Sequence, residues 1–184
     1  KRKHNYNRAL RSTLYTLLVV AAVAVLPKDC TILRLNDSKK LSEKCREELF
    51  LEIKEKAAAY GIGIVSPEVI DSINILQATY EAMRQAISML EPQPTLLLND
   101  AVNIPGEPMK QVSIIKGDAK SISIGAASII AKVTRDAMMV EYDKIYPEYD
   151  FASNKGYGSA KHIEALKKYG PCPIHRKSFI HNFI

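Results

Sequence analysis

An α/β fold, in which a mixed β-sheet is flanked by helices and followed by a C-terminal helical segment, is predicted by three features of this sequence. Short apolar runs typical of buried strands alternate along the chain with longer segments of helical period. With 184 residues and 47% hydrophobic side chains, the chain is large enough to form a real core. It contains no repeat, linker or low-complexity tract, so we expect one domain over residues 1–184.

The first strand is predicted over residues 19–26, where four valines favour a buried strand. This apolar run is too short to span a bilayer, and no small-residue cleavage pattern precedes Lys28. We therefore expect neither a membrane span nor a signal peptide. A helix begins near Leu41, since apolar residues recur about every fourth position, Ser42 can cap it and Gly61 ends it.

A strand over residues 61–65 leads into a second helix. Ser66-Pro67-Glu68 is typical of a helix start, with a capping serine, a proline at the first helical position and an acid in the first turn. Pro92 ends that helix. Buried strands are then predicted over residues 95–98 and 112–115.

Two further helices complete the predicted order of elements. A long helix runs over about residues 121–146 and stops at Pro147. An amphipathic helix over about residues 159–169 is closed by Gly170-Pro171.

Charge and cysteine content restrict the partners and the compartment. The net charge is +6, and positive side chains gather in residues 1–11 and 151–184. Such clusters suggest a polyanionic partner, although a solvated helix face explains the charge equally well. The three cysteines are odd in number and lack metal-ligand spacing, which favours a reducing, cytoplasmic setting over a disulfide framework or a zinc site.

The strongest chemical signal is a pair of acids at predicted strand ends. Asp100 follows the strand over residues 95–98, and Asp118 follows the strand over residues 112–115. Open α/β sheets place their sites at the carboxyl ends of strands, and two close carboxylates need a cation such as Mg²⁺ or Mn²⁺ between them. Acids that only form turns after strands are the alternative, and on spacing alone they are the commoner case.

Two further groups of polar residues stand out by their spacing. Ser128, Lys132 and Asp136 recur every four residues among alanines and isoleucines, so they form a polar ladder on the long helix. A buried lysine or aspartate is costly unless it is paired or used.

Loops carry the remaining candidates. Tyr157 stands between two glycines and could stack on a sugar or a base, with Ser159 close by; a packed loop tyrosine is the plainer alternative. The segment Ser38-Lys39-Lys40 is a polar loop by default and a phosphate contact if the site lies near it.

Six ordered blocks of this sequence resemble the ribonuclease HII family, and together they cover roughly residues 19–179. The blocks are residues 35–50, 61–71, 73–87, 99–106, 114–139 and 154–179. The resemblance implies an RNase H-like fold and an endonuclease that cuts the RNA strand of RNA/DNA hybrids and cuts at ribonucleotides embedded in duplex DNA. It also implies two divalent ions that activate water and stabilise the leaving oxygen.

The resemblance assigns roles residue by residue. Asp100 and Asp118 match two of the family's four metal-binding carboxylates, and Tyr157 matches a tyrosine that stacks at the junction sugar. The segment from Ser38 to Lys40 matches one that lies along the nucleic-acid backbone. Lys132 and Asp136 match the long helix, from which we expect support for the site. We expect a cytoplasmic monomer whose partner is a nucleic acid and not a membrane.

The chain departs from the family at its beginning. Family members carry an Asp-Glu-x-Gly-Arg-Gly-Pro motif just ahead of the strand that matches residues 19–26, whereas residues 1–27 contain no Asp, no Glu and no Gly. Three hypotheses follow: an active endonuclease, an inactive relative that only binds hybrid or duplex, and a chain whose residues 1–18 are disordered or are not the natural sequence.

Overall fold

The computed structural model describes residues 18–35 and 38–180, and these divide into two compact units. The strand unit takes residues 20–65 and 76–134, and the helical unit takes residues 66–75 and 135–180. The expectation of one domain over residues 1–184 stays a prediction. Apart from Leu18, the atypical segment over residues 1–18 lies outside the described residues.

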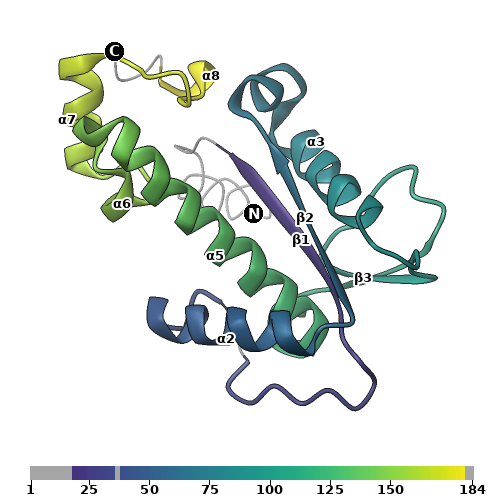
Figure 1. Ribbon diagram of the computed structural model, residues 1–184. Helices are drawn as coiled ribbons and strands as arrows, with labels where there is room; N and C mark the ends of the chain where they lie inside the picture. Colours follow the sequence, from purple (N-terminus) through teal and green to yellow (C-terminus); the bar gives the residue numbers. More distant parts are fainter. Residues whose placement is uncertain (1–17, 36–37, 181–184) are drawn as a thin grey trace. The chain divides into compact units, whose positions relative to one another are not determined.

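The predicted α/β class is confirmed by the order of the elements along the chain (Figure 1). They are β1 (Val19–Val25), α2 (Glu43–Lys56), β2 (Ala59–Val65), α3 (Pro67–Ser88), β3 (Leu96–Asp100), β4 (Lys110–Ile114), α4 (Gly117–Lys120), α5 (Ile122–Ile145), a 3₁₀ turn (Pro147–Tyr149), α6 (Phe151–Asn154), α7 (Ala160–Tyr169) and α8 (Lys177–Ile180). In the described part of the chain, none of the helices combines the length and the apolar content needed to cross a membrane.

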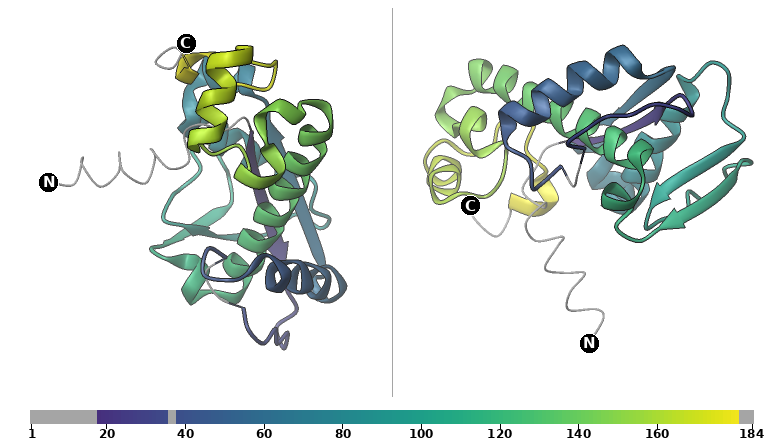
Figure 2. Two further views of the ribbon diagram at one scale, coloured as in Figure 1. Left: turned by 90° about the vertical axis from the view of Figure 1, so that its left-hand side faces the viewer. Right: turned by 90° about the horizontal axis from the view of Figure 1, so that it is seen from below.

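The part of the chain that the structure describes has four strands, which form two separate pairs. β1 is hydrogen-bonded to β2, and β3 is hydrogen-bonded to β4. β3 and β4 run parallel, with Leu96 opposite Lys110 and Asp100 opposite Ile114 (Figure 2, teal strands). The prediction that both strands of this pair are buried was wrong in part. Val112 of β4 is 39% exposed, and in β3 the buried Leu97 alternates with Leu96 and Leu98, which are 44% and 40% exposed, because successive side chains of a strand point to opposite faces.

The core of the strand unit lies between α2 and the first half of α5. Leu49 and Ile53 of α2 are fully buried against Ile129 and Ile130 of α5, and Ala24 of β1 joins the same cluster. Figures 1 and 2 show α2 lying across this part of α5. Burial of such side chains stabilises each by about 1.5–3 kcal/mol, and it holds the start of α5 in place.

Two glycines allow β2 to lie directly against α3. A Cβ atom at Gly61 would overlap the carbonyl oxygen of Ala86, and one at Gly63 would overlap the carbonyl oxygen of Ala82. Both alanines are buried. The small residues on both elements therefore set a close contact that a larger side chain on β2 would not permit.

In the helical unit, Asp71 of α3 ties down the segment that leads into α8. Its carboxylate accepts from Arg176 Nε at 3.4 Å and from the Ser178 backbone N–H at 3.2 Å, and Ser178 Oγ also donates to it. Partial burial acts to raise the pKa of Asp71, but the bonds from Ser178 and Arg176 outweigh it and leave the pKa below its usual value.

We expect Asp71→Asn to lower the free energy of unfolding by about 1–2 kcal/mol at neutral pH. Because the pKa of Asp71 is depressed in the folded state, its contribution is present above the unfolded pKa and is lost as the pH falls through the folded value. Urea unfolding of both proteins at pH values from about 7 down to about 3 measures this. A difference that persists at the acid end would contradict it, and Glu55→Gln, on the exposed face of α2, is the control.

Candidate functional site

The register of β3 and β4 brings the two predicted acids to one edge of the sheet. Asp100 is the last residue of β3, and Ile114, its partner, is the last residue of β4. The chain then passes through Lys116 into α4, whose second residue is Asp118. The backbone N–H of Gly117 donates to Asp100 Oδ1 at 2.8 Å. The side chain of Asp100 thus contacts the residue next to Asp118.

The backbone around this edge takes conformations that sequence alone does not reveal. Ala101 and Lys116, one after β3 and one after β4, both have positive φ, at 60° and 58°. Left-handed residues other than glycine cost of order 1–3 kcal/mol and gather at functional sites. Here these two residues change the direction of the backbone where it leaves β3 and β4.

Two glycines let the segments approach each other. A Cβ atom at Gly117 would lie 2.6 Å from Ile124 Cδ1, and one at Gly125 would lie 2.9 Å from the carbonyl oxygen of Asp118. Ile124 Cδ1 is the end of a flexible side chain and can turn away, but the carbonyl oxygen of Asp118 is backbone and cannot. Glycine at position 125 therefore lets the start of α5 pack against α4. The position of Asp118 therefore depends on Gly125, which belongs to a different helix.

The donor chemistry of this edge suits a hard cation. Asp100 is exposed and Asp118 is half-buried, so both carboxylates lie at the surface of the strand unit. The bond from Gly117 orients Asp100 through one carboxylate oxygen. Mg²⁺ is commonly held by one or two carboxylates, with water and substrate phosphate oxygens completing its shell. Among the described residues, no three His, Cys, Asp or Glu side chains gather to hold a metal, so any ion here depends on ligands beyond this pair.

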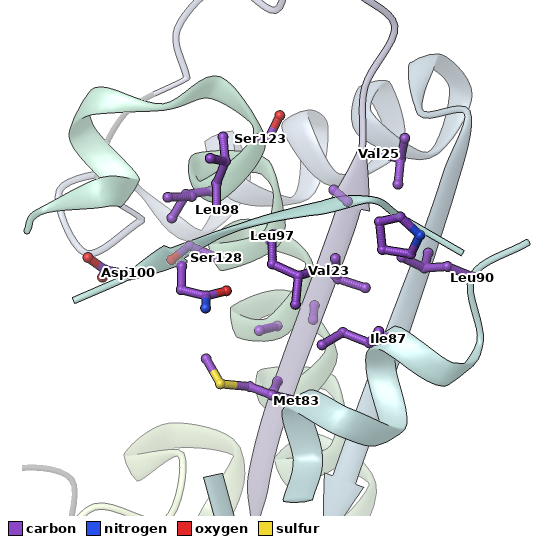
Figure 3. Close-up of a pocket in the computed structure, with 18 of the residues that line it drawn as sticks. Val23, Val25, Met83, Ile87, Leu90, Leu97, Leu98, Asp100, Ser123 and Ser128 are labelled. Atoms are coloured by element: carbon purple, nitrogen blue, oxygen red, sulfur yellow. The ribbon is translucent and has the colours of Figure 1, made fainter. Parts of the chain in front are cut away.

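An apolar pocket of about 450 Å³ lies in the strand unit beside this edge. Its walls come from β1, α3, β3 and α5, and Figure 3 shows Asp100 at one end of the lining and Leu90 at the other. Val23, Ile87 and Leu97 lie between them. Among the described residues that line the pocket, Asp100, at one end, is the one charged residue, and most of the others are apolar.

The serine of the predicted backbone-binding loop is tied to the polar ladder of α5. Ser38 is 5% exposed, and its Oγ lies 2.9 Å from Ser128 Oγ. Arg46 of α2 donates to the Ser38 carbonyl at 3.1 Å. Lys39 and Lys40 are exposed. These contacts hold Ser38 against α5 and α2 and leave Lys39 and Lys40 at the surface, where they are accessible to a phosphate.

The other two residues of the ladder differ in burial. Lys132 is half-buried. Asp136 is 7% exposed, and its Oδ1 lies 3.9 Å from Arg135 NH1. The expected cost of a buried acid is thus offset by an adjacent guanidinium.

In the helical unit, Tyr157 is held from several sides. Tyr157 is 37% exposed, and the centroid of its ring lies 5.3 Å from the Arg135 guanidinium carbon, within cation–π range. Arg135 also donates to the Lys155 carbonyl at 3.1 Å, and burial lowers its pKa. The Tyr157 carbonyl lies 2.9 Å from His162 Nδ1. The ring thus presents one partly open surface from a well-supported loop.

Arg135 and His162 both contact the segment that carries Tyr157, but neither was predicted as a site residue from the sequence. The only sequence signal for Arg135 was its place beside Asp136, and His162 stands in an ordinary amphipathic helix. Ser159, predicted to contact substrate, caps α7 by accepting from the His162 backbone N–H at 3.2 Å. Asp100, Asp118, Ser38 and Ser128 belong to the strand unit, and Tyr157 and Ser159 to the helical unit.

Comparison with known proteins shows the family of this chain. A family model described as ribonuclease HII matches residues 14–182. A ribonuclease HII from Lachnoclostridium phytofermentans is 67% identical over 164 residues, covering 89% of this chain and 65% of that protein. One from Clostridioides difficile is 60% identical over 166 residues, covering 90% of this chain and 65% of that protein. The chain therefore spans 65% of the length of these two relatives.

A solved structure shows the same fold. The crystal structure of the ribonuclease H2 from Pyrococcus horikoshii OT3 superposes with a TM-score of 0.73 at 28% sequence identity. The match covers 89% of this chain and 87% of that one.

Proposed function

The chain belongs to the ribonuclease HII family, and from this premise we propose that it is a metal-dependent endonuclease acting on RNA/DNA hybrids and on ribonucleotides embedded in duplex DNA. One observation supports the proposal above the others. The 2.8 Å bond from Gly117 to Asp100 joins two strand-end segments, each of which carries an acid. Paired acids at the carboxyl edge of a sheet suit metal-assisted hydrolysis of a phosphodiester.

Asp100 and Asp118 would hold Mg²⁺ or Mn²⁺. Bound ions of this kind supply an activated water and stabilise the oxygen that leaves. The residues of this chain would orient the two carboxylates. The Gly117 N–H fixes one oxygen of Asp100, and the packing of Gly125 against α4 fixes the backbone of Asp118.

The proposed substrate contacts divide by chemistry. Lys39 and Lys40 would meet backbone phosphates beside the buried Ser38, and Tyr157 would stack on a sugar at the junction, with Ser159 close to it. Ser128, Lys132 and Asp136 would support these groups from α5. Ser128 does so through its 2.9 Å contact with Ser38.

A second candidate function is binding without cleavage. Residues 1–27 contain no acid, and the described residues offer no group of three metal ligands. A protein that kept Tyr157 and the lysines but lacked a complete ligand set would hold a hybrid and leave it intact.

The two candidates separate in one assay. A DNA duplex that carries one ribonucleotide and an end label is incubated with the full chain and Mg²⁺ or Mn²⁺. If the endonuclease proposal is right, cutting occurs beside the ribonucleotide, requires the metal and is lost in Asp100→Asn. Binding of the same duplex without any cutting above the Asp100→Asn background would support the second candidate. A protein that neither binds nor cuts the duplex would contradict both candidates.

A further inference from the structure

Two histidines and a cysteine backbone form a buried chain of hydrogen bonds in the helical unit. His162 Nδ1 lies 2.9 Å from the Tyr157 carbonyl, and His162 Nε2 lies 2.9 Å from His175 Nε2. His175 Nδ1 accepts from the Cys172 backbone N–H at 3.0 Å. Both rings are buried, at 1% and 3% exposure.

The partners at the two ends determine where every proton lies. A carbonyl only accepts, so His162 must carry its proton on Nδ1 and leave Nε2 bare. His175 must then donate from its own Nε2, which leaves its Nδ1 bare to accept from Cys172. Each neutral ring has one donor and one acceptor, and this arrangement uses both. All of these bonds therefore point one way, from Cys172 to the Tyr157 carbonyl.

We propose that His162 is a positioning residue for Tyr157, and that it receives its orientation through His175 from the segment that follows α7. This inference rests on the proposed function, because the contact of Tyr157 with nucleic acid is itself proposed. His162 has no route to the substrate in this role; it fixes the backbone that carries the tyrosine. Arg135 holds the ring of Tyr157, and His162 holds its carbonyl.

The surroundings keep the chain of bonds in its neutral form. Tyr149 and Phe151 pack against both rings, and their ring centroids lie 4.8–6.2 Å from those of the histidines. The titratable groups that face the pair are Tyr149 and Cys172. The negative charge of Glu148 contributes to raising the pKa of both groups. Cys172 Sγ also lies 3.0 Å from His175 Nδ1.

These groups stay uncharged over a wide range of pH. Burial lowers the pKa of His162, and burial together with the neighbouring His162 lowers the pKa of His175 to about 4. Burial also raises the pKa of the Cys172 thiol to about 11 and that of Tyr149 to about 12. A second proton on His162 would sit on Nε2 and face the donor of His175 at 2.9 Å, and one on His175 would sit on Nδ1 and face the Cys172 N–H at 3.0 Å. This chain of hydrogen bonds therefore requires both rings to be neutral.

The first measurement is ring nitrogen NMR of the full chain. We expect a proton on Nδ1 of His162 and on Nε2 of His175, with His175 titrating near its lowered pKa of about 4 and His162 titrating below the pKa of an ordinary histidine. The opposite tautomers, or a pKa near 6.5 for either ring, would contradict this chain of hydrogen bonds. This measurement needs no nucleic acid and no altered protein.

Two variants then separate positioning from general packing. The amide nitrogen of His162→Asn takes the place of Nδ1 and can still donate to Tyr157, whereas that of His162→Gln takes the place of Nε2 and cannot. Binding is measured with a fluorescent RNA/DNA duplex in chelator, so that no cleavage occurs. His162→Gln should weaken binding at least about fivefold, and His162→Asn should recover most of that loss.

The decisive comparison repeats the change in a Tyr157→Ala background. If His162 acts through Tyr157, His162→Gln should cause no further loss there. An equal loss in both backgrounds, or no loss in either, would overturn the proposal. If the unaltered chain binds no hybrid, the proposed function fails. The inference is then judged by amide relaxation at Tyr157, which must become more mobile in His162→Gln and not in His162→Asn.

Discussion

Asp118→Asn is expected to lower the rate of metal-dependent cleavage by at least about 10²- to 10³-fold. The substitution keeps the size and planarity of the side chain and removes only its charge, so α4 should keep its contact with Gly125. A neutral amide binds a hard divalent cation far more weakly than a carboxylate does. The expected loss is therefore in metal binding and, through it, in the rate of cleavage, and the fold should be unaffected.

Single-turnover cleavage of the ribonucleotide-containing duplex, at saturating protein, measures this effect. Mn²⁺ binding followed by calorimetry should show a parallel loss of affinity. Glu55→Gln removes an exposed acid of α2 and should leave both measurements unchanged. If Asp118→Asn cleaves as fast as the parent chain, then Asp118 is a turn-forming acid and the assignment of the edge as a metal site is wrong.

Gly63→Ala should destabilise the strand unit by about 3 kcal/mol or more. The added methyl group would overlap the carbonyl oxygen of Ala82, which belongs to the helical backbone of α3 and cannot rotate away. Relief requires β2 and α3 to move apart, and that exposes Ala82 and its neighbours to water. A chain of this size should lose about 2–4 °C of melting temperature per kcal/mol, hence roughly 6–12 °C in total.

Thermal melts followed by circular dichroism measure that loss. Ile64→Ala is the matched control, because Ile64 is the next residue on the same strand, is 40% exposed and loses only surface methyl groups. Its melting temperature should fall by much less than that of Gly63→Ala. Equal melting of Gly63→Ala and the parent would show that β2 does not lie against α3 as described.

Elements with strong local signals could be predicted from the sequence, and their boundaries agree with the structure within a few residues. The valine run gives β1, the Ser-Pro-Glu start gives α3, and the long apolar helix before Pro147 gives α5. The burial of β4 could not be judged in this way. Its apolar residues resemble those of a buried strand, but burial depends on what covers the strand in space, and β4 pairs on one edge only in the part that is described.

The same division applies to the candidate site. Asp100 and Asp118 could be predicted as candidates because acids after apolar strands form a local pattern. The bond from Gly117 to Asp100 depends on the parallel register of two strands, and the contact of Ser38 with Ser128 joins residues 90 positions apart. His162 and His175 gave no sequence signal, because a histidine on an amphipathic helix, or in the segment that follows it, is ordinary until its neighbours are known.

The unpaired strand edges also have a consequence for how separate molecules of this chain meet. Within the described residues β1 and β3 each bond to a single strand, and both line the apolar pocket of Figure 3. An extended segment from another molecule would find main-chain partners and hydrophobic walls together there. The net charge of +6 opposes such encounters, and salt screens that repulsion. Dilute solutions of low ionic strength are therefore the conditions that keep the molecules apart.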